Sequence, residues 1–271
     1  EDNENSTTVV NEPRHEQEPL PLAFLVPLDE ERESVDIKFP SSVLEVPLRS
    51  PLDRCPDDAH DSPPHLRFVR IDEERVEISE KLGNTLHMAG GGTGTDLIPN
   101  VYEGGLTIWE CSLDLVRYLH NNHDDIFMGD KNGSNRAIES CLDLGCGHGL
   151  TGIYVLSRSE AQVCFSDFNE DVLRHVTWPN VLMNVTGDRR FNATYFAGDW
   201  NSLHAALEVH GTPGSSRNKE RGETVTEATG KFDLILTAET CYTEKSCREV
   251  AQLIKSLLKN PSARAFVAAK R

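Results

Sequence analysis

The sequence lacks the features that would place it in several classes of protein. Its longest apolar stretch, residues 20–28, is short and carries Pro21 and Pro27, so no segment is expected to span a membrane. The seven cysteines are odd in number and contain no CxxC pair, which argues against a metal site or a disulfide framework. No cluster of Lys or Arg offsets the formal net charge of −17, so direct nucleic-acid binding is not expected. The lack of cysteine pairs favours a reducing compartment.

Acidic residues and prolines are concentrated in the first part of the chain. Residues 1–100 contain 22 Asp or Glu against 9 Lys or Arg, together with 11 of the 14 prolines and no Trp or Tyr. A chain of this composition buries too little apolar surface to offset its conformational entropy. We therefore predict that residues 1–95 form an acidic, proline-rich and largely disordered region. Within it we expect disorder over roughly 1–60, short strands at 66–71 and 75–78, and a flexible glycine-rich linker at 89–95.

Apolar runs and helical patterns alternate through residues 96–271. Strands are predicted at 138–144, 163–167, 193–196, 232–237 and 263–269, with a charged insertion at 211–230. Helices are predicted at 111–121, 150–158, 170–177 (with Asn169 as its cap) and 244–259. This alternation indicates parallel βαβ units, hence an α/β domain with a doubly wound, mostly parallel sheet.

A glycine-rich loop follows the first of these strands. The apolar run that contains Asp143 is followed by Gly145, Gly147 and Gly149, where a strand must end. Glycine there lets the backbone adopt positive φ and approach a ligand closely, since no Cβ is in the way. A strand, a glycine loop and a helix in succession form the mouth of an α/β nucleotide site, so we expect a ligand with an adenosine portion.

Two interpretations of this loop are open. Gly147-x-Gly149-x-x-Gly152, with Asp167 twenty residues further on, fits the dinucleotide fingerprint and would make the protein a nicotinamide enzyme. Asp143 together with the glycines at 145, 147 and 149 instead gives an Asp-x-Gly-x-Gly-x-Gly pattern. That pattern resembles the first motif of the S-adenosylmethionine-dependent methyltransferases with a seven-stranded sheet.

Further motifs carry a more specific resemblance. Residues 96–111 (DLIPNVYEGGLTIWEC), 167–169 (DFN), 178–181 (WPNV), 198–200 (GDW) and 236–242 (LTAETCY) follow one another in the required order. With them, the chain from about 96 to 271 closely resembles the protein-histidine N-methyltransferases. The resemblance implies a Rossmann-like class I methyltransferase fold, S-adenosyl-L-methionine as cofactor and methylation of a histidine in a large-subunit ribosomal protein.

The same resemblance implies a cellular location and a partner, and the chain differs from the family in one respect. We expect a monomer of the cytoplasm and nucleus whose partner is a basic ribosomal protein, which the acidic balance of the chain suits. The family continues past the fifth strand with a glycine-rich turn and two further strands, whereas this chain stops at Lys270 and Arg271. We expect a fragment whose sheet ends in an unprotected edge.

The resemblance also implies site residues. Asp143 would order the methionine end of the cofactor, Asp167 would hold the ribose hydroxyls and Asp199 would bind the adenine amino group. Glu239 and Tyr242 are the predicted catalytic residues, in the crevice at the carboxyl ends of the strands. The predicted cofactor-binding residues are Ile108, Trp109, Glu110, Cys111, Ser112, Asp143, Gly145, Gly147, Gly149, Asp167, Phe168, Asn169, Gly198, Asp199, Trp200 and Thr237.

Alternatives remain for several of these residues and for the function. Asp143 would serve equally as a cap for neighbouring amides, and Glu239 as a helix cap; His148 is given no catalytic role. The acceptor would be lysine in a related enzyme of the same fold. A non-catalytic module that binds a ribosomal protein through the acidic region is the second class of function.

Overall fold

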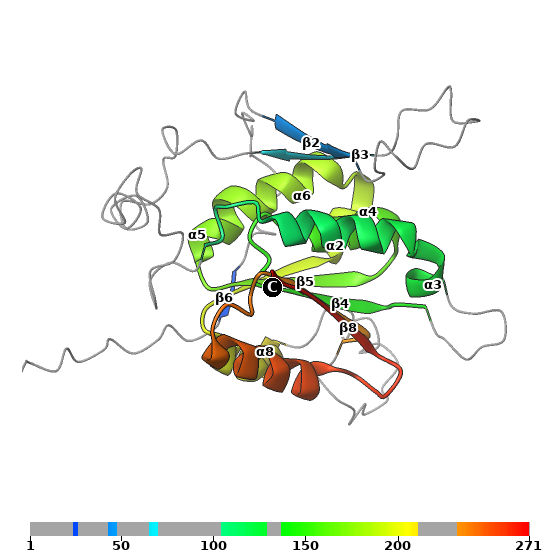
Figure 1. Cartoon of the computed structure of the whole chain (residues 1–271). Helices are drawn as coiled ribbons and strands as arrows, with labels where there is room; N and C mark the ends of the chain where they lie inside the picture. Colours follow the sequence, from blue (N-terminus) through cyan, green and yellow to red (C-terminus); the bar gives the residue numbers. More distant parts are fainter. Residues whose placement is uncertain are drawn as a thin grey trace, which may run out of the picture.

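The computed structural model describes residues 24–26, 43–47, 65–69, 104–128, 137–210 and 232–270. A six-stranded sheet forms their centre, in the order β1-β6-β5-β4-β7-β8 (Figure 1). Its strands are β1 (Phe24–Leu25), β4 (Ser140–Leu144), β5 (Gln162–Asp167), β6 (Ala193–Ala197), β7 (Leu234–Ala238) and β8 (Arg264–Ala268). The last five are mutually parallel, and β1 pairs with β6 in the antiparallel sense. The predicted α/β fold with a mostly parallel sheet is confirmed.

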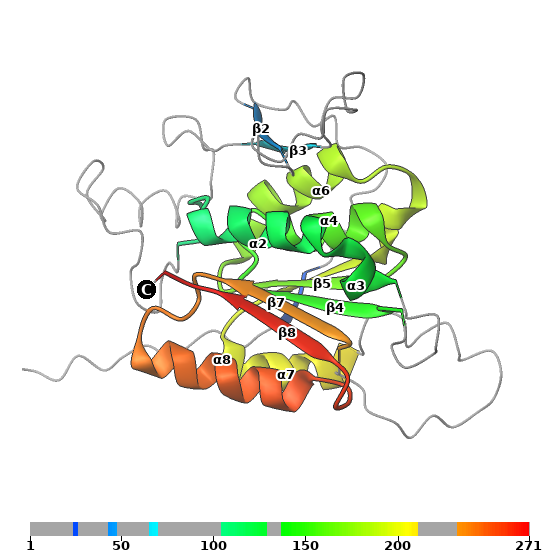
Figure 2. The same ribbon diagram turned by 45° about the vertical axis from the view of Figure 1, so that its right-hand side comes forward.

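Helices cover both faces of the sheet. Figures 1 and 2 show α2 (Glu110–Asn121), α4 (Leu150–Arg158) and α6 (Trp178–Asn184) on one face, and α7 (Trp200–His210) and α8 (Glu244–Leu257) on the other. Successive side chains of a strand point to opposite faces, so Cys141 packs with the first layer of helices and Leu142 with the second. Because both faces are covered, β4 is buried along its whole length. That is why apolar residues predominate in it, with Ser140 and Asp143 as the exceptions.

The helix after β5 is longer than predicted. It begins with α5 (Glu170–Val172), continues through a π-helical turn, η3 (Leu173–Thr177), and runs on as α6. Asn169 occupies the predicted N-cap position, although its side chain makes no capping hydrogen bond. The predicted helix ended at 177, two residues before Pro179. Proline is nevertheless tolerated in the first turn of α6, where the wider π-helical turn has already interrupted the regular ladder.

Two strands lie where disorder was predicted. In β1, Leu25 pairs with Phe196, and the adjacent Val26 is buried and donates its backbone N–H to Tyr195 O at 2.8 Å. β2 (Val43–Pro47) forms an antiparallel pair with β3 (His65–Val69), above α6 in Figure 1. The prediction of disorder over roughly 1–60 is therefore wrong for β1 and β2, whereas the strand expected near 66–71 is confirmed as β3.

The remaining elements are short. They are α3 (His123–Phe127) and the 3₁₀ turn η4 (Gly187–Asn192), neither of which was predicted. The strand at 75–78, the linker at 89–95, the domain boundary at 95 and the insertion at 211–230 lie outside the described residues and stay predictions. Among the helices described, none is both long and apolar enough to cross a bilayer. Across the same residues, no group of His, Cys, Asp and Glu is arranged to hold a metal ion.

Candidate functional site

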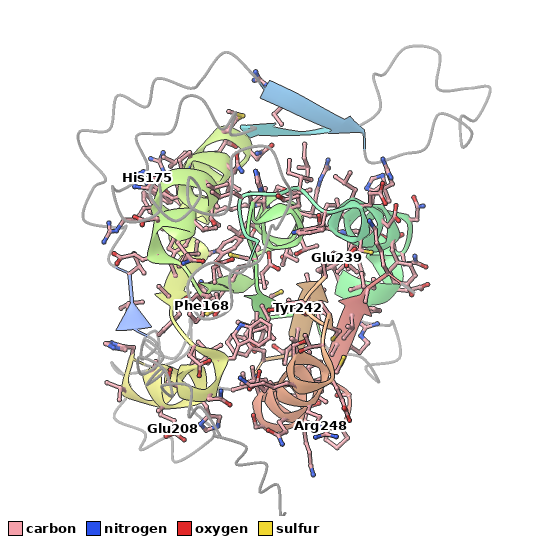
Figure 3. The ribbon with its side chains drawn as sticks, turned by 60° about the vertical axis from the view of Figure 1, so that its left-hand side comes forward. Phe168, His175, Glu208, Glu239, Tyr242 and Arg248 are labelled. Atoms are coloured by element: carbon pink, nitrogen blue, oxygen red, sulfur yellow. The ribbon has the colours of Figure 1, made fainter. Side chains whose placement is uncertain are left out.

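A cavity of about 350 Å³ lies at the carboxyl ends of the central strands. The loops that follow β4, β5, β6 and β7 line it, together with the first turns of α2 and α8. Figure 3 shows Phe168, Tyr242 and Glu239 gathered at this end of the sheet, with His175, Glu208 and Arg248 at the periphery. Open parallel sheets bind their ligands in this crevice, so the cavity is where the topology places a binding site.

The glycine loop needs glycine for two separate reasons. Gly145, Gly147 and Gly149 have φ of 65°, 49° and 74°, a region that other residues rarely adopt. In addition, a Cβ on Gly145 would come within 2.6 Å of Thr240 Cγ2. The backbone can therefore pass closely beneath the cavity only because these side chains are absent.

Asp143 supports the loop as well as lining the cavity. Its Oδ1 accepts a hydrogen bond from Thr151 Oγ1 at 2.7 Å, and its Oδ2 accepts one from the Gly152 backbone N–H at 2.8 Å. The capping role considered from the sequence is thus present. Burial raises the pKa of this carboxyl to about 7; the hydrogen bonds from Thr151 and Gly152 oppose the rise, and the charge of Asp167 adds to it.

Asp167 ties the end of β5 to the glycine loop. Its Oδ2 accepts a hydrogen bond from the Gly147 N–H at 2.9 Å, and its Oδ1 accepts one from the Asn169 N–H at 3.1 Å. The residue is buried and lines the cavity. A carboxylate accepts hydrogen bonds from hydroxyl groups, so a side chain at this wall has the chemistry to bind a ligand hydroxyl.

Asp199 and Trp200 form the wall that follows β6. Asp199 Oδ2 accepts from the Asn201 N–H at 2.9 Å, which fixes the carboxylate at the start of α7. The indole Nε1–H of Trp200 is buried without a hydrogen-bond partner among the described residues. Its ring lies against the glycine loop, since a Cβ on Gly145 would be 3.6 Å from Trp200 Cζ2. The indole therefore presents an unused donor beside the cavity.

The start of α2 forms a third wall. Trp109 Nε1 donates to Gly104 O at 3.2 Å, and Ser112 Oγ donates to Trp109 O at 2.6 Å, so this turn is fixed by its own side chains. Glu110, by contrast, is exposed and forms an ion pair with Lys270 at 3.3 Å. Cys111 lies behind the wall; burial, and then the neighbouring Glu239, raise the pKa of its thiol to about 11.

Glu239 is strained and its carboxylate is incompletely bonded. It is the one non-glycine residue with positive φ among those the structure describes, at 57°. Its backbone N–H donates to Ala268 O at 2.8 Å, while its Oε1 is buried without a partner. Helix α8 is capped by Thr243, which forms a capping box with Ser246, so the alternative role of Glu239 as a helix cap is wrong. Strain of this kind is concentrated at functional sites.

The cavity brings together most of the predicted site residues, but not all of them. Those that line it are Ile108, Trp109, Ser112, Asp143, Gly145, Gly147, Asp167, Phe168, Asp199, Trp200, Glu239 and the half-exposed Tyr242. Those that do not line it are Glu110, Cys111, Gly149, Asn169, Gly198 and Thr237. Thr237, for example, is fully buried beneath the floor, where its hydroxyl donates to Leu144 O at 2.9 Å.

Other parts of the lining were not predicted from the sequence. The loop before α2 contributes Gly104, Gly105 and Thr107, and the glycine loop contributes His148. The first turns of α8 contribute Thr243, Lys245, Ser246 and Glu249. The Thr-x-x-Ser spacing of a capping box, directly after Tyr242, was the available signal that a helix begins at the cavity.

The strand order, the glycine loop and the acids at the strand ends define a Rossmann-like α/β fold. Residues 100–206 match the family described as lysine methyltransferase.

Curated relatives give a finer placement. The histidine protein methyltransferase 1 homolog of Dictyostelium discoideum is 36% identical over 176 residues, which are 65% of this chain and 46% of that protein. The homolog of Bos taurus is 34% identical over 169 residues, 55% of this chain and 39% of that protein. Histidine protein methyltransferase 1 of Saccharomyces cerevisiae is 37% identical over 101 residues, 34% of this chain and 25% of that protein. The chain thus spans less than half the length of these relatives. The predicted resemblance is confirmed: over these residues the chain is similar to the protein-histidine N-methyltransferases.

Proposed function

We propose that this chain belongs to an S-adenosyl-L-methionine-dependent enzyme that methylates a ring nitrogen of histidine in a basic large-subunit ribosomal protein. The observation that carries the proposal is the buried, unpartnered Oε1 of the strained Glu239, on the same cavity as Asp143, Asp167 and Asp199. None of the described residues satisfies that oxygen, so it is available to accept a hydrogen bond from a ligand or substrate.

The lining fits the chemistry of the cofactor. Asp143 and the glycine loop would hold the charged amino-acid end, Asp167 the ribose hydroxyls and Asp199 the adenine amino group, since carboxylates accept from ammonium, hydroxyl and amino donors alike. Hydrogen bonds to charged groups contribute about 1.5–3 kcal/mol each. The ring of Phe168 offers an apolar surface for the adenine base. When bound, the cofactor supplies an electrophilic methyl group whose leaving group is a neutral thioether.

The contribution of the chain is then to orient the acceptor. An imidazole is neutral near pH 7 and carries one N–H and one basic nitrogen. Glu239 Oε1 accepts the N–H, which fixes the tautomer and aims the lone pair of the other nitrogen into the cavity. After transfer, the same carboxylate neighbours the N–H that must be lost. Most of the acceleration comes from holding the nitrogen in line with the methyl group.

A lysine acceptor is the main alternative, and the description of the matched family supports it. The two acceptors differ in protonation, because a lysine ammonium must lose a proton near pH 10 whereas an imidazole is already neutral at pH 7. Transfer to histidine should therefore reach a plateau above about pH 7. Transfer to lysine should continue to rise up to about pH 10.

The test combines labelling with mapping. Large-subunit ribosomal proteins are incubated with the protein and methyl-labelled cofactor, and the modified residue is identified by mass spectrometry. A label on histidine supports the proposal, and a label on lysine replaces it with the alternative. Binding of a ribosomal protein that survives Asp143→Ala, with no label at any pH, would favour the non-catalytic module.

The setting is proposed on composition. The excess of Asp and Glu in residues 1–100 supports a basic partner through charge complementarity. Six cysteines among the described residues are unpaired, which supports the reducing environment of cytoplasm and nucleus. Sedimentation of the purified chain at several concentrations tests the expected monomer.

A further inference from the structure

His148 is the least satisfied polar side chain of the cavity. It is only 3% exposed and lines the cavity, yet neither of its ring nitrogens has a hydrogen-bond partner within the part of the chain that the structure describes. Leaving a buried donor and acceptor unpaired costs stability, so each such group in a native fold needs an explanation.

The backbone on either side of the ring is held firmly. His148 O accepts from Asn180 Nδ2 at 3.1 Å, and the preceding Gly147 O accepts from Thr177 Oγ1 at 2.6 Å. The Gly147 N–H is bound by Asp167. The π-helical turn η3 and helix α6 thus fix the loop from outside, and the imidazole is positioned before any ligand arrives.

The environment keeps the ring neutral. Burial lowers the pKa of His148 to about 4; the backbone of Gly105 acts in the opposite direction, but its contact with the ring falls short of hydrogen-bond geometry. A neutral imidazole presents one N–H donor and one acceptor. The ring also precedes Gly149, the N-cap of the nine-residue helix α4, whose positive end favours an anion.

We propose that the His148 side chain is a further cofactor-binding residue, whose ring N–H donates to the carboxylate of the cofactor's amino-acid end at the start of α4. This rests on the proposed function, because the ligand is the cofactor named there. The carboxylate is the one anionic group of that ligand, and it matches a neutral donor beside a positive helix end. The acids Asp167 and Asp199 cannot serve it, since carboxylates repel one another.

The experiment compares two probes on the full chain by calorimetry. S-adenosylhomocysteine carries the amino-acid carboxylate, and 5′-methylthioadenosine lacks the whole amino-acid end. His148→Phe keeps a flat ring but removes both hydrogen-bonding atoms. We expect His148→Phe to weaken S-adenosylhomocysteine by at least about 10-fold. For methylthioadenosine we expect a change of less than about 3-fold. His175→Phe is the matched control, because that half-exposed histidine lies at the periphery in Figure 3 and should change neither affinity.

Several outcomes overturn the proposal. Equal losses of affinity for both probes would show that the His148 ring contacts the nucleoside instead. Unchanged affinities would show that His148 is a packing residue only. Neither result contradicts the proposed function. If the wild-type chain binds neither probe, the proposed function falls as well. If His148→Phe fails to unfold cooperatively, the smaller His148→Leu is measured instead and must show the same selective loss of S-adenosylhomocysteine affinity. His148→Gln, which keeps a hydrogen-bond donor, must retain part of that affinity.

Discussion

The two sides of the cavity are built differently. On the side of the glycine loop, the carboxylates of Asp143 and Asp167 are buried and each is bonded to loop or helix-start atoms nearby. On the side of β7 and α8, Glu239 is strained with a buried orphan oxygen, and Tyr242 is 44% exposed. The first side is rigid before a ligand binds, and the second leaves the Glu239 oxygen for a partner to satisfy. This suits a site in which one ligand is held by a fixed cradle and a second, larger one is only oriented.

The largest expected effect is on the β7 side of the cavity, and it tests whether the two sides work separately. Glu239→Gln should lower methyl transfer by about 100-fold, because the amide no longer accepts the acceptor's N–H as a charged group. Cofactor affinity should change little, since the loop side is untouched. Glu110→Gln is the control, because that glutamate is exposed, pairs with Lys270 and does not line the cavity. An equal loss of cofactor affinity in Glu239→Gln would show that the two sides do not work separately.

On the loop side, the strongest effect should be on stability. Gly149 and Gly187 have similar positive φ of 74° and 66°, but a Cβ at 149 would meet Thr177 Cγ2 at 2.9 Å while one at 187 meets nothing within 4 Å. Gly149→Ala should therefore lower the free energy of unfolding by about 1–3 kcal/mol more than Gly187→Ala does. Chemical denaturation of both variants measures the difference. Equal losses would mean that the loop relaxes easily and is less rigid than its contacts indicate.

The pH dependence of stability tests the buried carboxyl. The folded-state pKa of Asp143, about 7, lies above its ordinary value of 3.8. Between about pH 4 and 7 the folded state keeps a proton that the unfolded state has lost, so this group lowers the free energy of unfolding as pH rises, by up to about 1.4 kcal/mol per pH unit. Below that range the group does not change the free energy of unfolding, and above it the group lowers that free energy by a constant amount.

Asp143→Asn should flatten this slope. The amide oxygen can still accept from Gly152, and the amide nitrogen can donate to Thr151 Oγ1. Urea denaturation at pH 5, 6 and 7 compares the variant with wild type, and Asp188→Asn on the exposed turn η4 serves as the control that keeps the wild-type slope. An unchanged slope in Asp143→Asn would show that another group carries the dependence.

The smallest effect isolates the strain at Glu239. Glu239→Gly removes the Cβ and should raise the free energy of unfolding by about 1 kcal/mol relative to Glu239→Ala, which keeps the Cβ at positive φ. Both variants lose the carboxylate, so the pair differs in the Cβ: its strain in the folded state is opposed by the larger backbone entropy that glycine has in the unfolded state. A Gly variant no more stable than the Ala variant would mean that the backbone relaxes elsewhere.

The features that depend on local residue patterns could be predicted from the sequence. The parallel strands were visible because strands buried on both faces are continuously apolar, and Asp143, Asp167 and Asp199 meet because parallel strands end at one edge of the sheet. Helix α7 was missed although Leu203, Ala206 and Leu207 have helical spacing.

Tertiary context decided the rest. Strand β1 is two residues long and forms only by pairing with β6, a partner about 170 residues away. The positive φ of Glu239 is imposed by packing, since glutamate has no preference for it. Thr237 does not line the cavity because the two-residue period of β7 turns it to the face of Ile235.

Helix α6 carries two asparagines one turn apart. Asn180 holds the carbonyl of His148, and Asn184 holds both the N–H and the carbonyl of Arg67 in β3 while also donating to Asn180 O. A single helical turn therefore links an outer hairpin to the floor of the cavity through four hydrogen bonds. Hydrogen exchange with solvent at the Arg67 amide should consequently slow when a ligand stabilises the glycine loop. An amide outside the cavity would then report whether the cavity is occupied.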